Sequence, residues 1–141
     1  HARQIRVTAV ELDDEAAAYA ASRLQRPSRS VTAKVEDVLA SLFPADVVVL
    51  NPPRAGVDER VTAAIEGANP APACVIYVSC DPATLARDIA RMPSWDIRSV
   101  TAFDMFPQTA HVETVVELVP RSQRSQRSPG TSTGDQTGAT A

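Results

Sequence analysis

Short runs of β-branched and other apolar residues alternate with helical patterns along most of the chain. Several runs are apolar at consecutive positions, which is typical of parallel strands covered by helices on both faces. Strand, helix and strand in repetition predict an open α/β sheet, in which sites form at the carboxyl ends of the strands. The predicted strands are 5–10, 31–35, 47–50, 74–78, 97–103 and 112–119.

Three helices are predicted between these strands, at 14–24, 58–67 and 82–91. Each begins with a residue that caps a helix or favours its first turn, namely Asp14, Asp58 and Pro82. Only the segment 104–111 separates the last two strands, so we expect them to form an antiparallel hairpin at the sheet edge.

The chain divides into a predicted folded domain, 1–119, and a tail, 120–141. The tail contains Arg-Ser-Gln repeats followed by Gly, Thr, Ser, Asp and Ala, with almost no apolar side chains. Such a composition does not bury enough apolar surface to offset the entropy of ordering. We therefore expect the tail to be disordered.

Composition and charge exclude several classes of protein. With 44% hydrophobic and 22% charged residues, the chain is neither collagen, nor a coiled coil, nor wholly disordered. Its net charge of −3 gives no general attraction for phosphates, so any affinity for RNA must be local. Cys74 and Cys80, with His1 and His111, do not have the spacing of a metal site. The chain has neither a membrane-spanning apolar run nor a signal-peptide pattern, so we expect a cytoplasmic protein with no metal in this segment.

Acidic residues follow the first two predicted strands. Glu11, in Val-Glu-Leu-Asp, is positioned to accept hydrogen bonds from both hydroxyls of a ribose, or else it is a first-turn acid stabilised by the helix dipole. Asp37 is positioned to accept a hydrogen bond from an adenine amino group, or else it is the N-cap of a short helix. Two such acids at successive strand ends favour a nucleotide site.

A stiff loop and a cysteine follow the next two strands. In Asn-Pro-Pro-Arg-Ala-Gly, two prolines fix the backbone after Asn51, whose amide is suited to the edge of a planar base; the alternative is a rigid end to the strand. Cys80 ends Ile-Tyr-Val-Ser-Cys directly before a predicted helix, where the helix N-terminus favours the nucleophilic thiolate. Cys74 is interpreted as an inert core residue.

Glu113 and His111 lie at the start of the last predicted strand. Glu113 is either an exposed edge-strand acid or, if it lies near a thiolate, a general base. His111 is interpreted as a hydrogen-bonding residue that orients a neighbour, because no second His or Cys stands at metal-ligand spacing.

Together these segments resemble the class I, S-adenosylmethionine-dependent RNA (uracil-5-)-methyltransferases, which modify 23S rRNA and tRNA. The resemblance runs from about Val7 to Val119. The matches are Val-Glu-Leu-Asp at 10–13, Asn-Pro-Pro-Arg-Ala-Gly at 51–56, Ser-Cys-Asp-Pro-Ala-Thr-Leu-Ala-Arg-Asp at 79–88, and Phe-Asp-Met-Phe-Pro at 103–107 with Thr109, His111 and Glu113. The cysteine and Phe-Pro segments are highly specific together, whereas the first is generic.

The resemblance implies a role for each candidate residue. Cys80 is the nucleophile that adds to uracil C6, and Glu113 is the base that removes the C5 proton. S-adenosylmethionine is the cofactor, with Glu11 binding its ribose and Asp37 its adenine, and Asn51 lining the pocket between uracil and cofactor. Many family members have Asp in place of Asn51. The Asn-Pro-Pro-Arg and Asp-Met-Phe-Pro segments resemble those of the branch of the family that methylates 23S rRNA. The resemblance therefore favours 23S rRNA over tRNA as the substrate.

The resemblance also implies a Rossmann-like sheet truncated at its N-terminal side. The family's first, central strand and its Gly-rich loop would precede His1, so the strands at 5–10 and 47–50 would lack a common neighbour. We therefore expect the 141 residues alone to be inactive. The alternatives are an inactive α/β fragment and a nonenzymatic interaction module; a thiol redox protein is disfavoured because Cys74 and Cys80 are not in a Cys-x-x-Cys arrangement.

Overall fold

The structure is a computed structural model that describes residues 5–104 and 112–121. Its strands are β1 (Thr8–Glu11), β2 (Arg29–Thr32), β3 (Val47–Leu50), β4 (Cys74–Ser79), β5 (Trp95–Phe103) and β6 (Glu113–Pro120). Its helices are α1 (Asp14–Arg23), α2 (Val35–Val38), the 3-10 helix η1 (Leu39–Leu42), α3 (Glu59–Glu66) and α4 (Pro82–Ala90).

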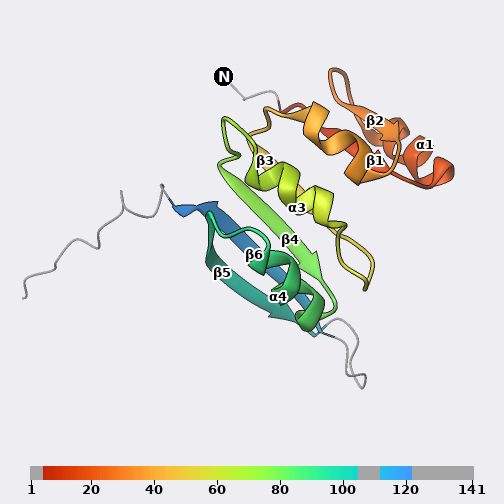
Figure 1. Cartoon of the computed structure of the whole chain (residues 1–141). Helices are drawn as coiled ribbons and strands as arrows, with labels where there is room; N and C mark the ends of the chain where they lie inside the picture. The colour runs from red at the N-terminus through yellow and green to blue at the C-terminus, as the bar shows by residue number, and fades with distance from the viewer. Residues whose placement is uncertain (1–4, 105–111, 122–141) are drawn as a thin grey trace, which may run out of the picture.

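The strands form two separate sheets (Figure 1). β1 and β2 are a parallel pair, and the second sheet has the order β3-β4-β6-β5. Within it, β3 and β4 are parallel, whereas β6 runs antiparallel to both of its neighbours. The α/β fold and the C-terminal antiparallel hairpin are thus confirmed, with β5 at the edge and β6 inside the sheet. Among the described residues, β1 and β3 have no neighbouring strand in common, as the resemblance implied.

Three aspartates cap the helices that follow β1, β3 and β4. The side chains of Asp13, Asp58 and Asp81 accept hydrogen bonds from backbone N–H groups in the first turn of α1, α3 and α4, at 2.8–2.9 Å. Each capped helix therefore begins directly after its aspartate, with Pro82 in the first turn of α4.

Helices α3 and α4 cover one face of the second sheet and form the main core with it (Figure 1). Buried and exposed side chains alternate along β3. Val48 and Leu50 are buried, whereas Val47 and Val49 are 50% and 66% exposed. The prediction that helices cover both faces is thus wrong for β3 within the described residues. The core consists of Val48, Leu50, Val61, Ile65, Val75, Tyr77, Leu85, Met92, Trp95, Val116 and Leu118, with Leu39 and Val57.

Two strands have bounds that differ from the predicted ones, because pairing with a neighbouring strand determines where each begins and ends. The second strand was predicted at 31–35, but Val35 begins α2, because Arg29 and Ser30 pair with β1 instead. The last strand continues one residue past its predicted end, since Pro120 pairs with Trp95. The rest of the predicted tail, from residue 122, lies outside the described residues. No helix in the described part of the chain has the length and apolar character needed to span a membrane.

Candidate active site

Three of the predicted site residues come to one end of the second sheet. Parallel pairing of Leu50 with Tyr77 brings Asn51, which follows β3, beside the end of β4. Antiparallel pairing of Ser79 with Thr114 brings Cys80, which follows Ser79, and Glu113, which precedes Thr114, to the same end of the sheet. These three residues are distant in sequence, and the register of β4 with its two neighbours brings them together.

The environment of these side chains differs. Cys80 and Glu113 are half-buried, whereas Asn51 is exposed. A half-buried thiol and a half-buried carboxylate at the same end of a sheet are accessible to a substrate yet partly shielded from water. The arrangement combines a nucleophile, a proton acceptor and an amide that has both donors and an acceptor.

The backbone on either side of Cys80 is held by a small polar turn. The Ser79 hydroxyl donates to the Asp81 carbonyl at 3.0 Å and accepts from the Asp81 N–H at 3.1 Å. The Asp81 side chain accepts from the Thr84 N–H at 2.9 Å, and this bond lowers the pKa of the Asp81 carboxyl. Cys80 is thus fixed between the last residue of β4 and the capping residue of α4.

The second cysteine has a different setting. Cys74 is at the opposite end of β4, where burial, followed by the negative charge of Glu117, raises the pKa of its thiol. A raised pKa keeps the thiol protonated and weakly nucleophilic at neutral pH. Cys74 is half-buried and not fully enclosed, so the prediction of a core position is only partly met.

The segment between β3 and α3, residues 51–57, is called the β3–α3 loop here. The Gly56 N–H donates to the Pro53 carbonyl at 2.8 Å, which closes a turn, and Gly56 has a φ of +77°. Arg54 lies close enough to Asp81 for its positive charge to lower the pKa of that carboxyl further. The loop is therefore folded against the beginning of α4.

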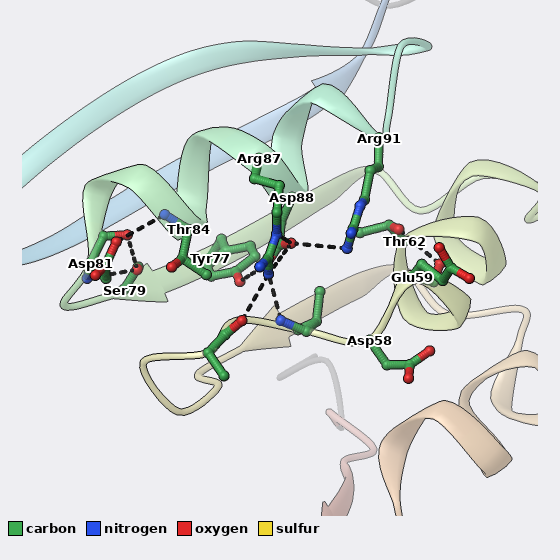
Figure 2. A network of polar contacts seen from close by, with 12 residues as sticks. Asp58, Glu59, Thr62, Tyr77, Ser79, Asp81, Thr84, Arg87, Asp88 and Arg91 are labelled. Atoms are coloured by element: carbon green, nitrogen blue, oxygen red, sulfur yellow. Dashed lines mark hydrogen bonds and ion pairs between the residues drawn. The ribbon is translucent and has the colours of Figure 1, made fainter.

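A buried carboxylate, Asp88 on α4, organises the contacts behind this loop (Figure 2). One of its oxygens accepts from the Tyr77 hydroxyl at 2.6 Å and from the Val57 N–H at 2.9 Å. The other accepts from Arg87 through Nε at 3.0 Å and Nη2 at 2.8 Å, and from Arg91 at 3.3 Å. Asp88 thus connects a strand, a loop and its own helix.

These contacts determine the ionisation of the pair. Burial by itself raises the pKa of Asp88, but hydrogen bonds from Tyr77, Val57 and Arg87 outweigh it, so the pKa of the carboxyl falls below its ordinary value. The pKa of Tyr77 rises because of burial and because its hydroxyl donates to Asp88. At neutral pH the pair is therefore a carboxylate and a neutral phenol.

The role of Asp88 was missed in the sequence, where it appeared only within a family motif. The signal was its spacing, since Asp88 lies three residues after Leu85 and therefore on the apolar side of α4. Tyr77 at a buried position of β4 also needs a partner for its hydroxyl.

The two predicted nucleotide-binding acids lie outside the second sheet. Glu11 is the last residue of β1 and is exposed, and within the described residues no side chain contacts its carboxylate. Asp37 lies within α2, whose N-cap is Lys34, so the N-cap alternative for Asp37 is wrong. Its carboxylate instead pairs with Arg60 at 2.8 Å.

Arg60 is the centre of an exposed ionic cluster. Besides Asp37, it pairs with Asp58 at 3.1 Å and with Glu36 at 3.6 Å. Its contacts join α2, which follows β2, to α3 of the second sheet's core. No set of His, Cys, Asp and Glu side chains in the described residues has an arrangement suited to a metal ion, and His111 lies outside those residues.

Comparison with known proteins identifies relatives over most of the chain. Residues 5–121 match the family model described as tRNA (uracil-5-)-methyltransferase. The chain is 39% identical over 121 residues to an RNA methyltransferase of Prochlorococcus marinus, which covers 80% of this chain. It is 44% identical over 77 residues, 55% of this chain, to the 23S rRNA (uracil(747)-C(5))-methyltransferase RlmC of Shewanella pealeana.

A solved structure has a similar fold. It is that of the Pyrococcus abyssi tRNA (uracil-54, C5)-methyltransferase in complex with S-adenosyl-L-homocysteine, with a TM-score of 0.73 and 32% identity over 83% of this chain. This chain covers 29% of that structure, and 28% and 20% of the Prochlorococcus and Shewanella proteins. It thus spans less than a third of the length of these three relatives.

Proposed function

Because the chain belongs to the tRNA (uracil-5-)-methyltransferase family, we propose that its natural gene product transfers a methyl group from S-adenosylmethionine to C5 of a uridine in RNA, in the cytoplasm. The observation that carries this proposal is the pairing of Ser79 with Thr114, because Cys80 and Glu113 are the residues next to this pair at the same end of the sheet. It brings a thiol nucleophile and a carboxylate base to one end of one sheet. We attribute the activity to the natural gene product and not to these 141 residues alone.

Cys80 is the proposed nucleophile. Uracil C5 is a weak nucleophile, and addition of the Cys80 thiolate to C6 moves electron density onto C5. S-adenosylmethionine, when bound, would supply the electrophilic methyl group to which C5 bonds, with S-adenosylhomocysteine as the leaving group. Cys80 follows β4 and precedes Asp81, the capping residue of α4, and this position supports its role because sites in open α/β sheets form at the carboxyl ends of strands.

Glu113 is the proposed base. After methylation C5 carries both the methyl group and its original proton, and Glu113 removes that proton. The electrons of the C5–H bond then re-form the C5–C6 double bond, and the Cys80 sulfur leaves C6 as a thiolate. The position of Glu113 at the start of β6, next to the residue that pairs with Ser79, supports this step, since a base must lie within reach of the adduct.

Glu11, at the end of β1, and Asp37, in α2, are assigned to the nucleoside part of S-adenosylmethionine. Glu11 has an exposed carboxylate with two oxygens and no side-chain partner among the described residues, and such a group accepts hydrogen bonds from two ribose hydroxyls. Asp37 has one oxygen on Arg60 and a second that is able to accept from an adenine amino group. Asn51 is assigned to the boundary between cofactor and uracil.

The substrate is proposed to be 23S rRNA in preference to tRNA. One relative is named for 23S rRNA, whereas the similar solved structure is named for tRNA, so the family includes both. The Asn-Pro-Pro-Arg and Asp-Met-Phe-Pro segments favour the rRNA branch. In either RNA the target base must leave its stack to reach Cys80.

The test is to incubate the natural gene product with S-adenosylmethionine and either 23S rRNA or tRNA, and to measure 5-methyluridine in each RNA by mass spectrometry. We expect methylation of 23S rRNA. A Glu113→Gln variant should accumulate a methylated RNA–protein adduct, because addition and methyl transfer precede the lost step. Full turnover by that variant would contradict the assignment of the base, and no methylation of either RNA would contradict the proposed function.

A further inference from the structure

The β3–α3 loop is fastened to α4 by a group that takes no part in the chemistry above. We infer that Asp88 is a positioning residue which, together with Arg87, holds this loop and thereby sets the place of Asn51 beside Cys80. This inference rests on the proposed function, in which Cys80 is the nucleophile.

Three consecutive residues of the loop are in contact with α4. The Ala55 carbonyl accepts from Arg87 Nη2 at 2.8 Å, and the Val57 N–H donates to Asp88 at 2.9 Å. Between these two residues, Gly56 lies so close to α4 that an added Cβ would overlap the Asp88 carboxylate and the Thr84 methyl group. The loop is therefore held on both sides of Gly56. Figure 2 shows Arg87 and Asp88, whose side chains make these two contacts.

The contact with Val57 is a buried one. Asp88 is fully enclosed, and the bond between its carboxylate and the Val57 N–H lies in the interior. If the loop moved away from α4, the buried Asp88 carboxylate would lose one of the hydrogen bonds that offset its burial, which is unfavourable. The carboxylate therefore favours one loop conformation.

The same carboxylate is linked to the strand that carries the nucleophile. Tyr77 donates to Asp88 and lies three residues before Cys80, and it also pairs with Leu50, directly before Asn51. The relative placement of Asn51 and Cys80 thus depends on strand pairing on one side and on the Asp88 contacts on the other. Displacement of a substrate-facing group by as little as about 1 Å is enough to slow an enzyme strongly.

Two arginines on α4 provide a matched pair for the test. Arg87 and Arg91 both pair with the same oxygen of Asp88. Among the hydrogen bonds of the described residues, only Arg87 also reaches the loop, at the Ala55 carbonyl. Arg87→Met removes two hydrogen bonds to Asp88 and the loop contact, whereas Arg91→Met removes one longer hydrogen bond to Asp88. A purely structural role of the network predicts that any loss of kcat follows a loss of stability in either variant.

The first readout is kinetic, on the natural gene product with its RNA substrate. We expect Arg87→Met to lower kcat by about tenfold with little change in KM for RNA, because positioning affects the reacting geometry more than binding. Arg91→Met should retain the wild-type kcat. Equal losses in both variants, or a wild-type kcat in Arg87→Met, would overturn the inference.

The second readout is hydrogen exchange at the Gly56 and Val57 amides, which requires no activity. We expect exchange to be about tenfold faster in Arg87→Met and unchanged in Arg91→Met. Equal exchange in the two variants overturns the inference even if both are active. Absence of methylation by the wild type contradicts the proposed function instead, and the exchange data still decide whether Asp88 and Arg87 hold the loop.

Asp88→Asn is the direct variant, and it retains the shape of the side chain while replacing one oxygen by a hydrogen-bond donor. We expect faster exchange at Val57 and a lower kcat. If this variant does not fold, the two arginine variants carry the test alone.

Discussion

Tyr77 and Asp88, eleven residues apart, meet in the interior through a 2.6 Å hydrogen bond from the phenol to the carboxylate. Both residues are fully buried. The bond spans β4 and α4, and it is one of the few buried polar interactions in a core that is otherwise apolar. A hydrogen bond to a buried charge contributes more to stability than one between neutral groups.

Removal of the phenol should therefore destabilise the fold measurably. We expect Tyr77→Phe to lower the free energy of unfolding by about 1.5–3 kcal/mol, the usual range for a hydrogen bond to a charged group. Tyr19→Phe is the control, because Tyr19 is 66% exposed on α1. Urea titration of both variants measures the difference, and equal stabilities would argue against the contribution of this bond.

Asp88 should make stability depend on pH in a defined window. Its pKa is lowered in the folded state from an ordinary value of 3.8, so the folded state favours the carboxylate. The resulting stabilisation is fully present above pH 3.8 and is lost as the pH falls through the lower, folded-state pKa.

The comparison of wild type with Asp88→Asn isolates this effect. Asp58 and Asp81, whose pKa values are also lowered, are present in both proteins. We expect the difference in unfolding free energy, about 3–5 kcal/mol near neutral pH, to shrink only below pH 3.8. A difference that already shrinks between neutral pH and this value would contradict the assignment.

Replacement of Gly56 by alanine should lower the stability of the fold more than the same replacement of Gly67. Its φ of +77° is unfavourable for residues with a side chain, and an added Cβ would overlap Asp88 and Thr84. We expect Gly56→Ala to cost about 1–3 kcal/mol of stability. Gly67→Ala is the control, because Gly67 ends α3 with a φ of −86°. Thermal unfolding of the two variants gives the comparison, and equal midpoints would be the contrary result.

The two cysteines should differ in their reaction with RNA that contains 5-fluorouridine. Fluorine at C5 prevents the final proton removal, so the adduct with the nucleophilic cysteine persists. We expect Cys80→Ala to abolish the adduct and Cys74→Ala to retain it, since the raised pKa of Cys74 disfavours its thiolate. Denaturing gels and intact mass detect the adduct. Its persistence in Cys80→Ala would refute the assignment of the nucleophile.

Glu11 should contribute to binding of the cofactor's ribose. Glu11→Ala in the natural gene product should weaken binding of S-adenosylhomocysteine by about tenfold, which corresponds to about 1.4 kcal/mol. Glu15→Ala is the matched control, because Glu15 is also exposed but belongs to the first turn of α1. Calorimetric titration measures both affinities. Equal affinities would instead favour the alternative in which Glu11 only stabilises the helix.

The sequence predicted the strands of the second sheet well because their apolar runs are distinct. Val47–Leu50 was predicted with its observed bounds, and β4 differs from the prediction by one residue. In contrast, β2 was displaced, because its position depends on pairing with β1 and not on its own apolar pattern. Local periodicity does not contain that information.

The positions of the candidate site residues at strand ends could be predicted from the sequence, but the contacts that hold the surrounding elements could not. Cys80, Asn51 and Glu113 follow or begin strands, which is visible in the sequence. The contacts of Asp88 with Tyr77 and Val57 connect residues up to thirty-one positions apart, and only the packing of α4 on the sheet brings them together. The pairing of Asp37 with Arg60 was likewise not accessible to sequence reasoning.

Arg60 makes the part of the proposed site that binds the nucleoside more sensitive to salt than the part around Cys80. The Ala33 N–H donates to the Glu11 carbonyl at 2.9 Å, and α2 follows directly and is held to α3 by Arg60 through exposed ion pairs. Exposed pairs weaken as ionic strength rises, whereas the ion pairs of the buried Asp88 carboxylate weaken much less. Rising salt should therefore loosen the alignment of the nucleoside end while leaving the nucleophile's surroundings intact.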